Sequence, residues 1–305
     1  MNIVFMGTPS YAVPSLAYLH KTYGVKLVVT QPDKKVGRKG EIEYSPVKQF
    51  ALDHHIPCFQ PIKMKTDYQV ILDANPDIII TAAYGQMIPN SVLESAISIN
   101  LHGSLLPKYR GGAPVQYAIK NGDETTGVTL MYMASKMDAG DMIATKEIRI
   151  EKTDNTETLM AKLSILAKQL VEEQLPLIME KTNARIPQDE ALVSFAYNIK
   201  PEQEILNFNQ TSNEIINHLR SLLPQPAGSI FINDIRIKVY EIEKSDIIIS
   251  GMPGEILSDK KELLVKSADG TLSITKLQPQ NKKVMAATDF LNGQKILKKG
   301  DIFNQ

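Results

Sequence analysis

Short apolar runs alternate with amphipathic stretches along the first half of the chain, and this alternation restricts the fold more than any other feature. The run Ile3–Met6 has the length of a buried strand, and the stretch after it has helical spacing. Strands that alternate with helices predict βαβ units and a parallel sheet. We expect strands at residues 3–6, 25–30, 57–59, 78–82, 97–101 and 128–133, and helices at 13–20, 46–54, 89–95 and 113–120.

The pattern changes after Asp154, where leucines at helical spacing predict a long helix that covers the sheet. An irregular segment from about residue 185 then leads to a helix at 212–223. Short β-like runs follow, and their spacing predicts a small barrel or sandwich. These runs lie at residues 229–232, 235–240, 247–249, 263–265 and 272–274. We therefore expect a first domain at 1–205, with its linker from about 185, and a second domain at 206–305.

The charges balance over the whole chain but not within its parts. The 305 residues carry 34 basic and 34 acidic side chains, which excludes a generally polycationic protein. Residues 1–205 hold 21 basic and 23 acidic side chains, whereas residues 206–305 hold 13 and 11. Basic residues gather in the segments 34–48 and 276–299, so a local basic patch remains compatible with the neutral total.

One cysteine, Cys58, excludes an internal disulfide and a multi-cysteine zinc site. The nearby His54 and His55 lack the spacing of a structural zinc site, so we expect no metal. The apolar start of the chain is too short for a signal peptide, and no run approaches the ~18 residues that span a bilayer. We expect a cytoplasmic protein that has no contact with a membrane.

Gly7 lies directly after the first expected strand, where a dinucleotide-binding fingerprint begins. The second and third glycines of that fingerprint are absent, since Ala12 and Pro14 follow instead. Dinucleotide binding by this loop is therefore not expected, and Gly7 is interpreted as part of a tight strand-to-helix turn.

The stretch from Asn100 to Pro114 is the most informative part of the sequence. Asn100 and His102 are two residues apart at the carboxyl end of an expected strand, so both side chains project to the same side. An amide and an imidazolium are hydrogen-bond donors that can stabilise an oxyanion on an attacked carbonyl. The glycine- and proline-rich continuation lets the backbone approach a ligand closely.

A second polar group follows the strand expected at 128–133. Asp138 and Asp141 both lie there, and we expect this strand end to face the same crevice as His102. A carboxylate at this place can favour the protonated imidazole or relay a proton through water. The residues alone do not decide between the two aspartates, because either can cap a turn.

Together these residues resemble the signature of the folate-dependent formyltransferases. That signature is an Asn-x-His, then Ser-Leu-Leu-Pro, and an Asp some 36 residues after the His, which selects Asp138. The match extends over essentially the whole chain. Further matching segments are Phe5–Pro9, Thr30–Asp33, Ser45–Lys48, Arg110–Pro114, Lys276–Pro279 and Asn292–Gln294.

The resemblance implies a Rossmann-like catalytic domain followed by an OB-like β-barrel that binds tRNA. It implies transfer of the formyl group of 10-formyltetrahydrofolate to the α-amino group of methionine on initiator methionyl-tRNA. We expect a monomer, since nothing in the sequence indicates an obligate oligomer. The catalytic residues would be Asn100, His102 and Asp138. The folate-binding residues would be Tyr84, Gly85, Ser104, Leu105, Leu106 and Pro107. The tRNA-binding residues would be Lys34, Lys35, Arg38, Lys39, Lys282 and Lys283.

Three other functions compete with this interpretation. A formyltransferase that acts on a small amine, such as glycinamide ribonucleotide or an amino sugar, would share the same three catalytic residues. The basic 34–48 loop and the C-terminal β domain argue against it, because a small substrate needs neither. A non-catalytic RNA-binding module would not need the three residues, and a dinucleotide-dependent oxidoreductase would need the missing fingerprint.

Overall fold

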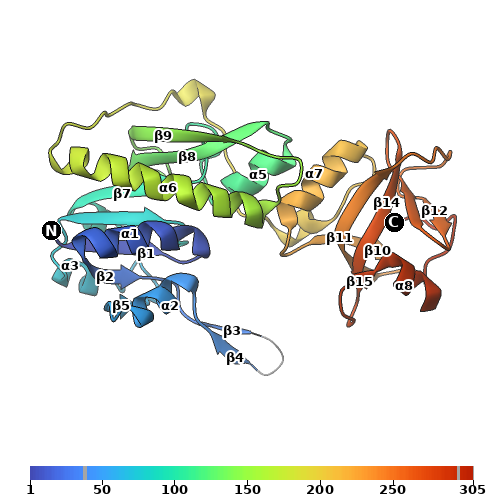
Figure 1. The fold of residues 1–305 in the computed structure, drawn as a ribbon, viewed down its shortest axis with the longest axis horizontal. Coiled ribbons are helices and arrows are strands. Elements are labelled where there is room, and N and C mark those ends of the chain that lie inside the picture. Colours follow the sequence, from blue (N-terminus) through green and yellow to red (C-terminus); the bar gives the residue numbers. More distant parts are fainter. Residues whose placement is uncertain (37–39, 294–295, 305) are drawn as a thin grey trace. The chain divides into compact units, whose positions relative to one another are not determined.

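The computed structural model describes residues 1–36, 40–293 and 296–304, which Figure 1 shows as a ribbon. The chain forms two compact units, each assembled from more than one stretch of sequence. The first contains Met1–Pro114, Thr125–Arg149 and Leu159–Tyr197. The second contains Val115–Glu124, Ile150–Thr158 and Asn198–Gln305. A single boundary near residue 205 therefore stays a prediction.

The first unit is built around one mixed β-sheet. Its strands are β1 (Ile3–Gly7), β2 (Val25–Val29), β5 (Cys58–Phe59), β6 (Ile78–Ala82), β7 (Ile97–His102), β8 (Thr125–Tyr132) and β9 (Met142–Arg149). Their order across the sheet is β5-β2-β1-β6-β7-β8-β9, and the first five of these are parallel. The predicted Rossmann-like sheet is thus confirmed, and the strand order reverses between β1 and β6, where such sheets bind ligands.

The direction of β8 differs from the sequence-based expectation. We expected it to end at the same edge as β7, but it runs antiparallel to β7, with His102 opposite Thr129 and Ile99 opposite Tyr132. Strand β9 pairs with β8 in the same antiparallel manner. The two form a hairpin at the edge of the sheet, and a hairpin needs only a short connection, whereas a parallel pair needs a crossover.

Helices and apolar side chains bury the parallel strands. All five residues of β1 and of β6 are buried, which is typical of strands covered on both faces. The helices of this part of the chain are the short 3₁₀ turn η1 (Ser10–Ala12), α1 (Val13–Tyr23), α2 (Pro46–Asp53), α3 (Gln69–Asp73) and α4 (Asn90–Leu93). Helix α1 packs against β1 and β2, and α2 packs against β2 and β5. The predicted long helix is α6 (Thr156–Met179), in which Leu159, Leu163 and Leu170 are buried.

A small hairpin, β3 (Lys34–Val36) and β4 (Glu41–Glu43), follows β2 and was not expected. Its strands pair in register, with Lys34 opposite Glu43. Residues 37–39, which include the predicted Arg38 and Lys39, lie outside the described residues.

The second unit contains an antiparallel sheet with its own core. Its elements are α5 (Pro114–Lys120), α7 (Ser212–Leu222), β10 (Gly228–Ile232), β11 (Ile235–Ser245), β12 (Ile256–Asp259), β13 (Leu263–Lys266), β14 (Thr271–Pro279), β15 (Met285–Ala286) and α8 (Ala287–Gly293). The strand order is β10-β11-β14-β13-β12, and β15 also pairs with β14. This curled sheet confirms the predicted small β domain. Helix α7 packs against β10 and β11, and Ile215 and Leu219 belong to the shared core.

Hydrogen bonds join α7 to the 150–158 stretch of this unit. The Arg220 guanidinium donates to the carbonyls of Asp154 and Glu151 at 2.6 Å each. The Thr156 hydroxyl donates to the Ser221 carbonyl at 2.7 Å. Residues 150–158 thus belong with the C-terminal part of the chain in space, although they precede α6 in sequence.

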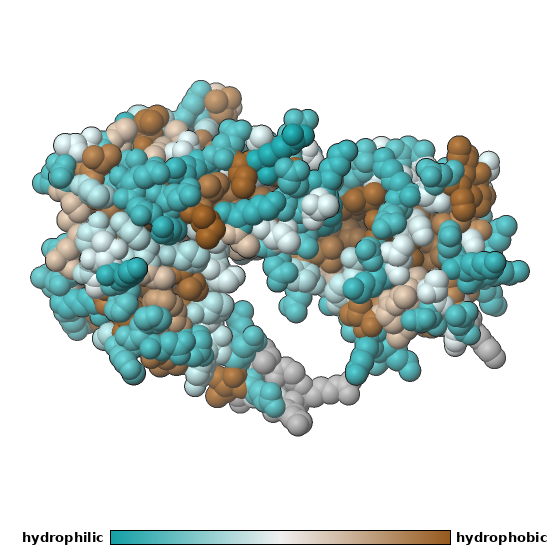
Figure 2. Space-filling view, in the orientation of Figure 1, coloured by the Kyte–Doolittle hydropathy of each residue, from teal (hydrophilic) through white to brown (hydrophobic). Residues whose placement is uncertain are grey.

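The strand expected at residues 247–249 is wrong. Strand β11 ends at Ser245, which is paired with Thr271, the first residue of β14, so the chain beyond it has no strand to pair with. Ile248 is 94% exposed in the loop that follows. Figure 2 shows that hydrophobic residues on the visible face are scattered among hydrophilic ones, as is ordinary for protein surfaces. None of the described helices is both long and apolar enough to cross a membrane.

Gly7 has a steric role at the end of β1. A Cβ at this position would lie 2.7 Å from the Cβ of Ala12 and 3.0 Å from the carbonyl oxygen of Ala82. Both distances are shorter than an ordinary van der Waals contact, so the turn after β1 needs a residue without a side chain.

We predict that Gly7→Ala lowers the free energy of unfolding by about 1–3 kcal/mol, because it overpacks this turn. Denaturant unfolding followed by circular dichroism measures the change. Gly293→Ala is the matched control, since among the described residues, apart from its chain neighbours and its own helix backbone, no atom lies within 4 Å of a Cβ at that position. An equal effect of the two substitutions would contradict the steric interpretation.

Candidate active site

The carboxyl end of β7 carries the two polar side chains that the sequence singled out. Asn100 and His102 lie two residues apart in this strand, so they project to the same face of the sheet. His102 is 5% exposed, and Asn100 is partly buried. A buried polar group needs hydrogen-bond partners, and those partners define the site.

A threonine on the neighbouring strand sets the orientation of the Asn100 amide. Thr81 lies opposite Asn100 in the pairing of β6 with β7. Its hydroxyl donates to Asn100 Oδ1 at 2.7 Å, so the amide oxygen is occupied and the Nδ2 group points the other way. Nδ2 lies 3.4 Å from Asp138 Oδ1. The amide therefore presents its donor, and not its acceptor, to the site.

The His102 ring is fixed by a backbone carbonyl. Its Nε2 lies 2.9 Å from the carbonyl oxygen of Tyr109, and a carbonyl only accepts, so Nε2 carries the hydrogen of this bond. The other ring nitrogen, Nδ1, faces Asp138 Oδ2 at 3.6 Å. This distance is longer than a hydrogen bond. Nδ1 is therefore the ring atom that is available to a reactant.

Asp138 reaches the site from the connection between β8 and β9. Its Oδ2 accepts a hydrogen bond from the Gly111 backbone N–H at 2.8 Å. Asp138 has a positive φ of 50°, a left-handed conformation that aspartate tolerates better than most residues. The loop thus brings the carboxylate to Asn100 and His102, although the antiparallel β8 does not end beside them. Asp138 therefore lies beside His102 as expected, but the β8–β9 connection places it there and not the end of β8.

Asp141, the alternative carboxylate, does not join this cluster. Its Oδ2 lies 3.2 Å from Nε of Arg185, and both side chains are substantially exposed. The Asp141 carbonyl accepts the backbone N–H of Tyr132 at the start of the hairpin connection. The geometry therefore agrees with the choice of Asp138.

Residues 188–196 bind both loops of the site, the one after β7 and the one between β8 and β9, and this role was not expected from the sequence. The Gln188 amide donates to the carbonyls of Asp138 and Gly140 at 2.8 Å each, and its oxygen accepts from Arg110 Nε at 3.0 Å. Arg110 is buried, and its guanidinium also pairs with Glu190 at 2.8 Å. This hydrogen bond lowers the pKa of the Glu190 carboxyl below its usual range. Thr81 could have been found, because it is the penultimate residue of β6, the strand next to β7.

The residues expected to bind folate lie on two loops beside the cluster. The Tyr84 carbonyl accepts from the Thr8 hydroxyl at 2.9 Å and from Gln31 Nε2 at 3.0 Å, which ties together the chain after β1, β2 and β6. Gly85 is exposed and has a φ of +96°. The Tyr84 side chain is buried, and burial raises the pKa of its hydroxyl. This loop lies where the strand order reverses.

The second of these loops is attached to β8. The Thr129 hydroxyl donates to the Ser104 carbonyl at 2.7 Å and accepts the Leu106 N–H at 3.1 Å. Ser104 and Leu106 are buried, and the Ser104 hydroxyl donates to the Lys108 carbonyl. Leu105 and Pro107 are partly exposed, so they are the members of this group whose side chains a ligand can reach.

The lysines expected to bind tRNA lie on surface hairpins. Lys34 is exposed on β3, and Lys282 and Lys283 are exposed in the turn between β14 and β15. The nearby Lys48 is paired with Asp33 at 2.5 Å, and this hydrogen bond lowers the pKa of the Asp33 carboxyl. The backbone of Lys35 lies in β3, while Arg38 and Lys39 fall outside the described residues.

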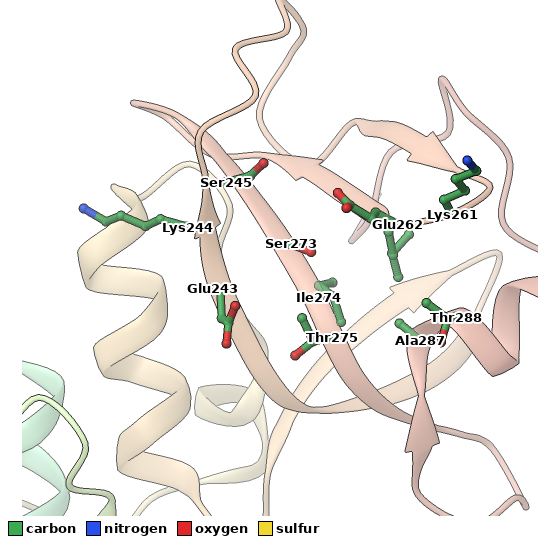
Figure 3. Close-up of a pocket in the computed structure, with 11 residues that line it drawn as sticks. Glu243, Lys244, Ser245, Lys261, Glu262, Ser273, Ile274, Thr275, Ala287 and Thr288 are labelled. Atoms are coloured by element: carbon green, nitrogen blue, oxygen red, sulfur yellow. The ribbon is translucent and has the colours of Figure 1, made fainter.

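A cavity of about 330 Å³ opens in the second unit. Figure 3 shows side chains from β11, β14 and the start of α8 around it, among them Glu243, Ser273 and Thr288. None of the predicted site residues lines this cavity. Its described lining mixes acidic, basic and hydroxyl groups without a buried cluster. Among the described residues, no group of three or more metal-ligating side chains comes together.

The chain is similar to formyl transferases along most of its length. Residues 1–175 match the formyl transferase family, and residues 198–295 match the formyl transferase C-terminal domain. The methionyl-tRNA formyltransferase of Lactiplantibacillus plantarum is 47% identical over 301 residues, which cover 96% of this chain and 95% of the relative. The methionyl-tRNA formyltransferase of Streptococcus sanguinis is 44% identical over 312 residues and is covered in full, as is this chain.

Solved structures with lower sequence identity have a similar fold. The sugar 3N-formyl transferase WlaRD, in the presence of dTDP and 5-N-formyl-THF, superposes with a TM-score of 0.67 at 21% identity, covering 93% of this chain and 99% of that one. HypX from Aquifex aeolicus in complex with tetrahydrofolic acid superposes with a TM-score of 0.66 at 16% identity. That match covers 100% of this chain and 51% of HypX.

We predict that Asp138→Asn accelerates hydrogen exchange of the Gly111 amide at least about fivefold. The substitution keeps a side chain that tolerates the positive φ, but it replaces a charged acceptor with a neutral one, and hydrogen bonds to charged groups are stronger by about 1 kcal/mol. Exchange measured by NMR tests this. Asp141→Asn is the control, because Asp141 does not contact Gly111. Unchanged exchange in the Asp138 variant would refute the hydrogen bond.

Proposed function

The chain belongs to the formyl transferase family, and we propose that it transfers the formyl group of 10-formyltetrahydrofolate to the α-amino group of methionine on initiator methionyl-tRNA. The product is N-formylmethionyl-tRNA, which is used to initiate translation. The observation that carries this proposal is the meeting of Asn100, His102 and Asp138 above the end of β7, in a chain similar to methionyl-tRNA formyltransferases over its full length.

The oriented donors at this place fit an attack on a formyl carbonyl. The neutral α-amine adds to the formyl carbon, and the carbonyl oxygen becomes an oxyanion. Asn100 presents Nδ2–H because Thr81 holds its oxygen, and His102, in the imidazolium form with a hydrogen on each ring nitrogen, presents Nδ1–H because Tyr109 holds Nε2–H. Donors that are already in place stabilise such an oxyanion without reorganisation.

Asp138 is placed to transfer a proton from the attacking nitrogen to the folate. After the attack the nitrogen is an ammonium, and the proton it loses must reach the N10 atom of the folate as the bond between N10 and the formyl carbon breaks. The Asp138 carboxylate lies within reach of both donors and is 15% exposed, so water can approach it. We assign it the role of a proton relay through water and of the group that orients His102.

The two loops beside this cluster support a binding site for folate. The loop that contains Tyr84 and Gly85 lies where the strand order reverses, and the 104–107 loop lies directly after β7. We propose that these loops hold the folate while its formyl group points toward Asn100. The alternative, a small amine substrate as in sugar formyl transferases, is less well supported, because those structures are only 21% identical to this chain.

The tRNA is proposed to contact lysines and arginines on the surface hairpins. The exposed Lys34, Lys282 and Lys283 can contact phosphates, and we assign the same role to Lys35, Arg38 and Lys39 in the 34–48 segment. Phosphate contacts need local positive charge and not a basic molecule, so the neutral total is no obstacle.

We predict that Asn100→Ala, His102→Ala and Asp138→Ala each lower kcat for formyl transfer, the first by ~10²–10³-fold, as for the loss of one oxyanion donor. The affinity for tRNA should stay near that of the unmodified chain. Formation of formylmethionyl-tRNA in a radiochemical assay measures kcat, and filter binding measures the affinity. Asp141→Ala is the control. Wild-type turnover in all three variants would refute the site assignment.

We predict that Arg38→Ala raises KM for the tRNA and leaves folate binding unchanged, because it removes a phosphate contact. Steady-state kinetics with each substrate varied in turn separate the two effects. Binding of the tRNA should also weaken as salt rises. Salt-insensitive binding would contradict recognition through phosphates.

A further inference from the structure

Two aromatic side chains lie exposed and stacked beside the catalytic loops, and the proposed chemistry does not use them. The rings of Phe195 and Tyr197 have centroids 5.6 Å apart and an interplanar angle of 1°. Phe195 is 46% exposed and Tyr197 is 58% exposed. Large aromatic side chains usually contribute to cores and interfaces, so an exposed parallel pair is a candidate contact surface.

The backbone explains why both rings face outward. Residues 194–196 are extended and run beside the 107–113 loop, where the Arg110 N–H donates to the Ser194 carbonyl and the Ala196 N–H donates to the Arg110 carbonyl, both at 2.8 Å. Side chains alternate in an extended segment, so Ala196 is buried against the loop while Phe195 and Tyr197 are exposed. Backbone hydrogen bonds thus hold the segment in place, and its extended conformation exposes both aromatic rings.

Two contacts, through Ala196 and Gly111, link the segment that carries this aromatic pair to the catalytic carboxylate. A Cβ on Gly111 would lie 2.5 Å from the Ala196 carbonyl oxygen, so these two backbones touch. The Gly111 N–H donates to Asp138. The residue between the two aromatics therefore packs directly on the residue that binds Asp138.

We propose that Phe195 and Tyr197 form a stacking surface for an unpaired base at the aminoacylated end of the tRNA. This inference rests on the proposed function. The terminal nucleoside carries the methionyl ester, so its base is separated from the reacting amine by only the ester and a ribose. We infer that this base lies on the surface next to Asp138, to which the 195–197 segment is linked through the contact of Ala196 with Gly111.

The chemistry of the surface suits a nucleobase. Every base has a flat π-face, and stacking on an aromatic side chain contributes about 1–3 kcal/mol per base without requiring a particular sequence. Lys136 is exposed on the loop that carries Asp138, so positive charge lies on the same loop as the catalytic carboxylate. The folate also has aromatic rings, but its proposed loops follow β6 and β7, whereas the aromatic pair lies on the 188–197 segment.

The test compares variants that keep or lose the rings. Phe195→Leu with Tyr197→Leu keeps apolar bulk but removes stacking, and we expect KM for methionyl-tRNA to rise about tenfold, with kcat and the KM for 10-formyltetrahydrofolate unchanged. Phe195→Tyr with Tyr197→Phe keeps both rings and should behave as wild type. Leu192→Ala is the control for an exposed apolar residue in the same segment, since Leu192 is 65% exposed.

A spectroscopic measurement tests stacking without relying on turnover. A tRNA with 2-aminopurine in place of its terminal adenine should lose fluorescence on binding to the wild-type chain, and the Leu variant should abolish this quenching. Absence of quenching in the wild type, or equal tRNA KM in the Leu and wild-type chains, would overturn the proposal. So would a rise in the folate KM alone, which would assign the rings to the folate. A wild-type chain that does not formylate methionyl-tRNA would refute the proposed function, while the quenching would still report on stacking.

Discussion

The Asp138 carboxylate is the interaction on which the arrangement of the site depends. One oxygen accepts the Gly111 N–H, and the two oxygens face His102 and Asn100. These contacts join the end of β7 and the loop directly after it to the connection between β8 and β9, which lies further along the sequence. A charge this well enclosed is stable only when hydrogen bonds compensate its loss of water. The contacts that place the carboxylate are therefore also the contacts that make its burial possible.

The supporting contacts extend outward from that carboxylate. Gln188 binds the carbonyls of Asp138 and Gly140 and also accepts from Arg110, so one side chain holds both loops. Arg110 is buried, and its charge is balanced by Glu190, which is 75% exposed at the side chain. A buried guanidinium that loses its partner is strongly destabilising. The order of the site thus depends on the irregular 185–197 segment, which sequence analysis interpreted as a linker.

The sequence predicted the parallel strands, the long helix and the small β domain, because each has a periodicity that reflects burial. It did not predict the direction of β8, since the same apolar run is compatible with either direction. It also misassigned residues 247–249, where β propensity was present but no partner strand was available. Asn100 and His102 could be identified from their place after a strand. Choosing Asp138 over Asp141 needed family resemblance, because the fold of a loop is set by contacts such as Gly111 and Gln188 that lie far away in sequence.

The balance of charge on the first unit bears on how a polyanion is recognised. Lys48 is paired with Asp33, so part of the positive charge in the 34–48 segment is already compensated within the protein. A lysine that is paired with a carboxylate must leave this partner before it binds a phosphate. Its contribution to the binding free energy from counterion release is therefore smaller. In the proposed complex with tRNA, contacts that carry no charge then contribute more to recognition, and the proposed stacking of a base on Phe195 and Tyr197 is such a contact. A neutral protein can in this way be selective for RNA because its attraction to RNA in general is weak.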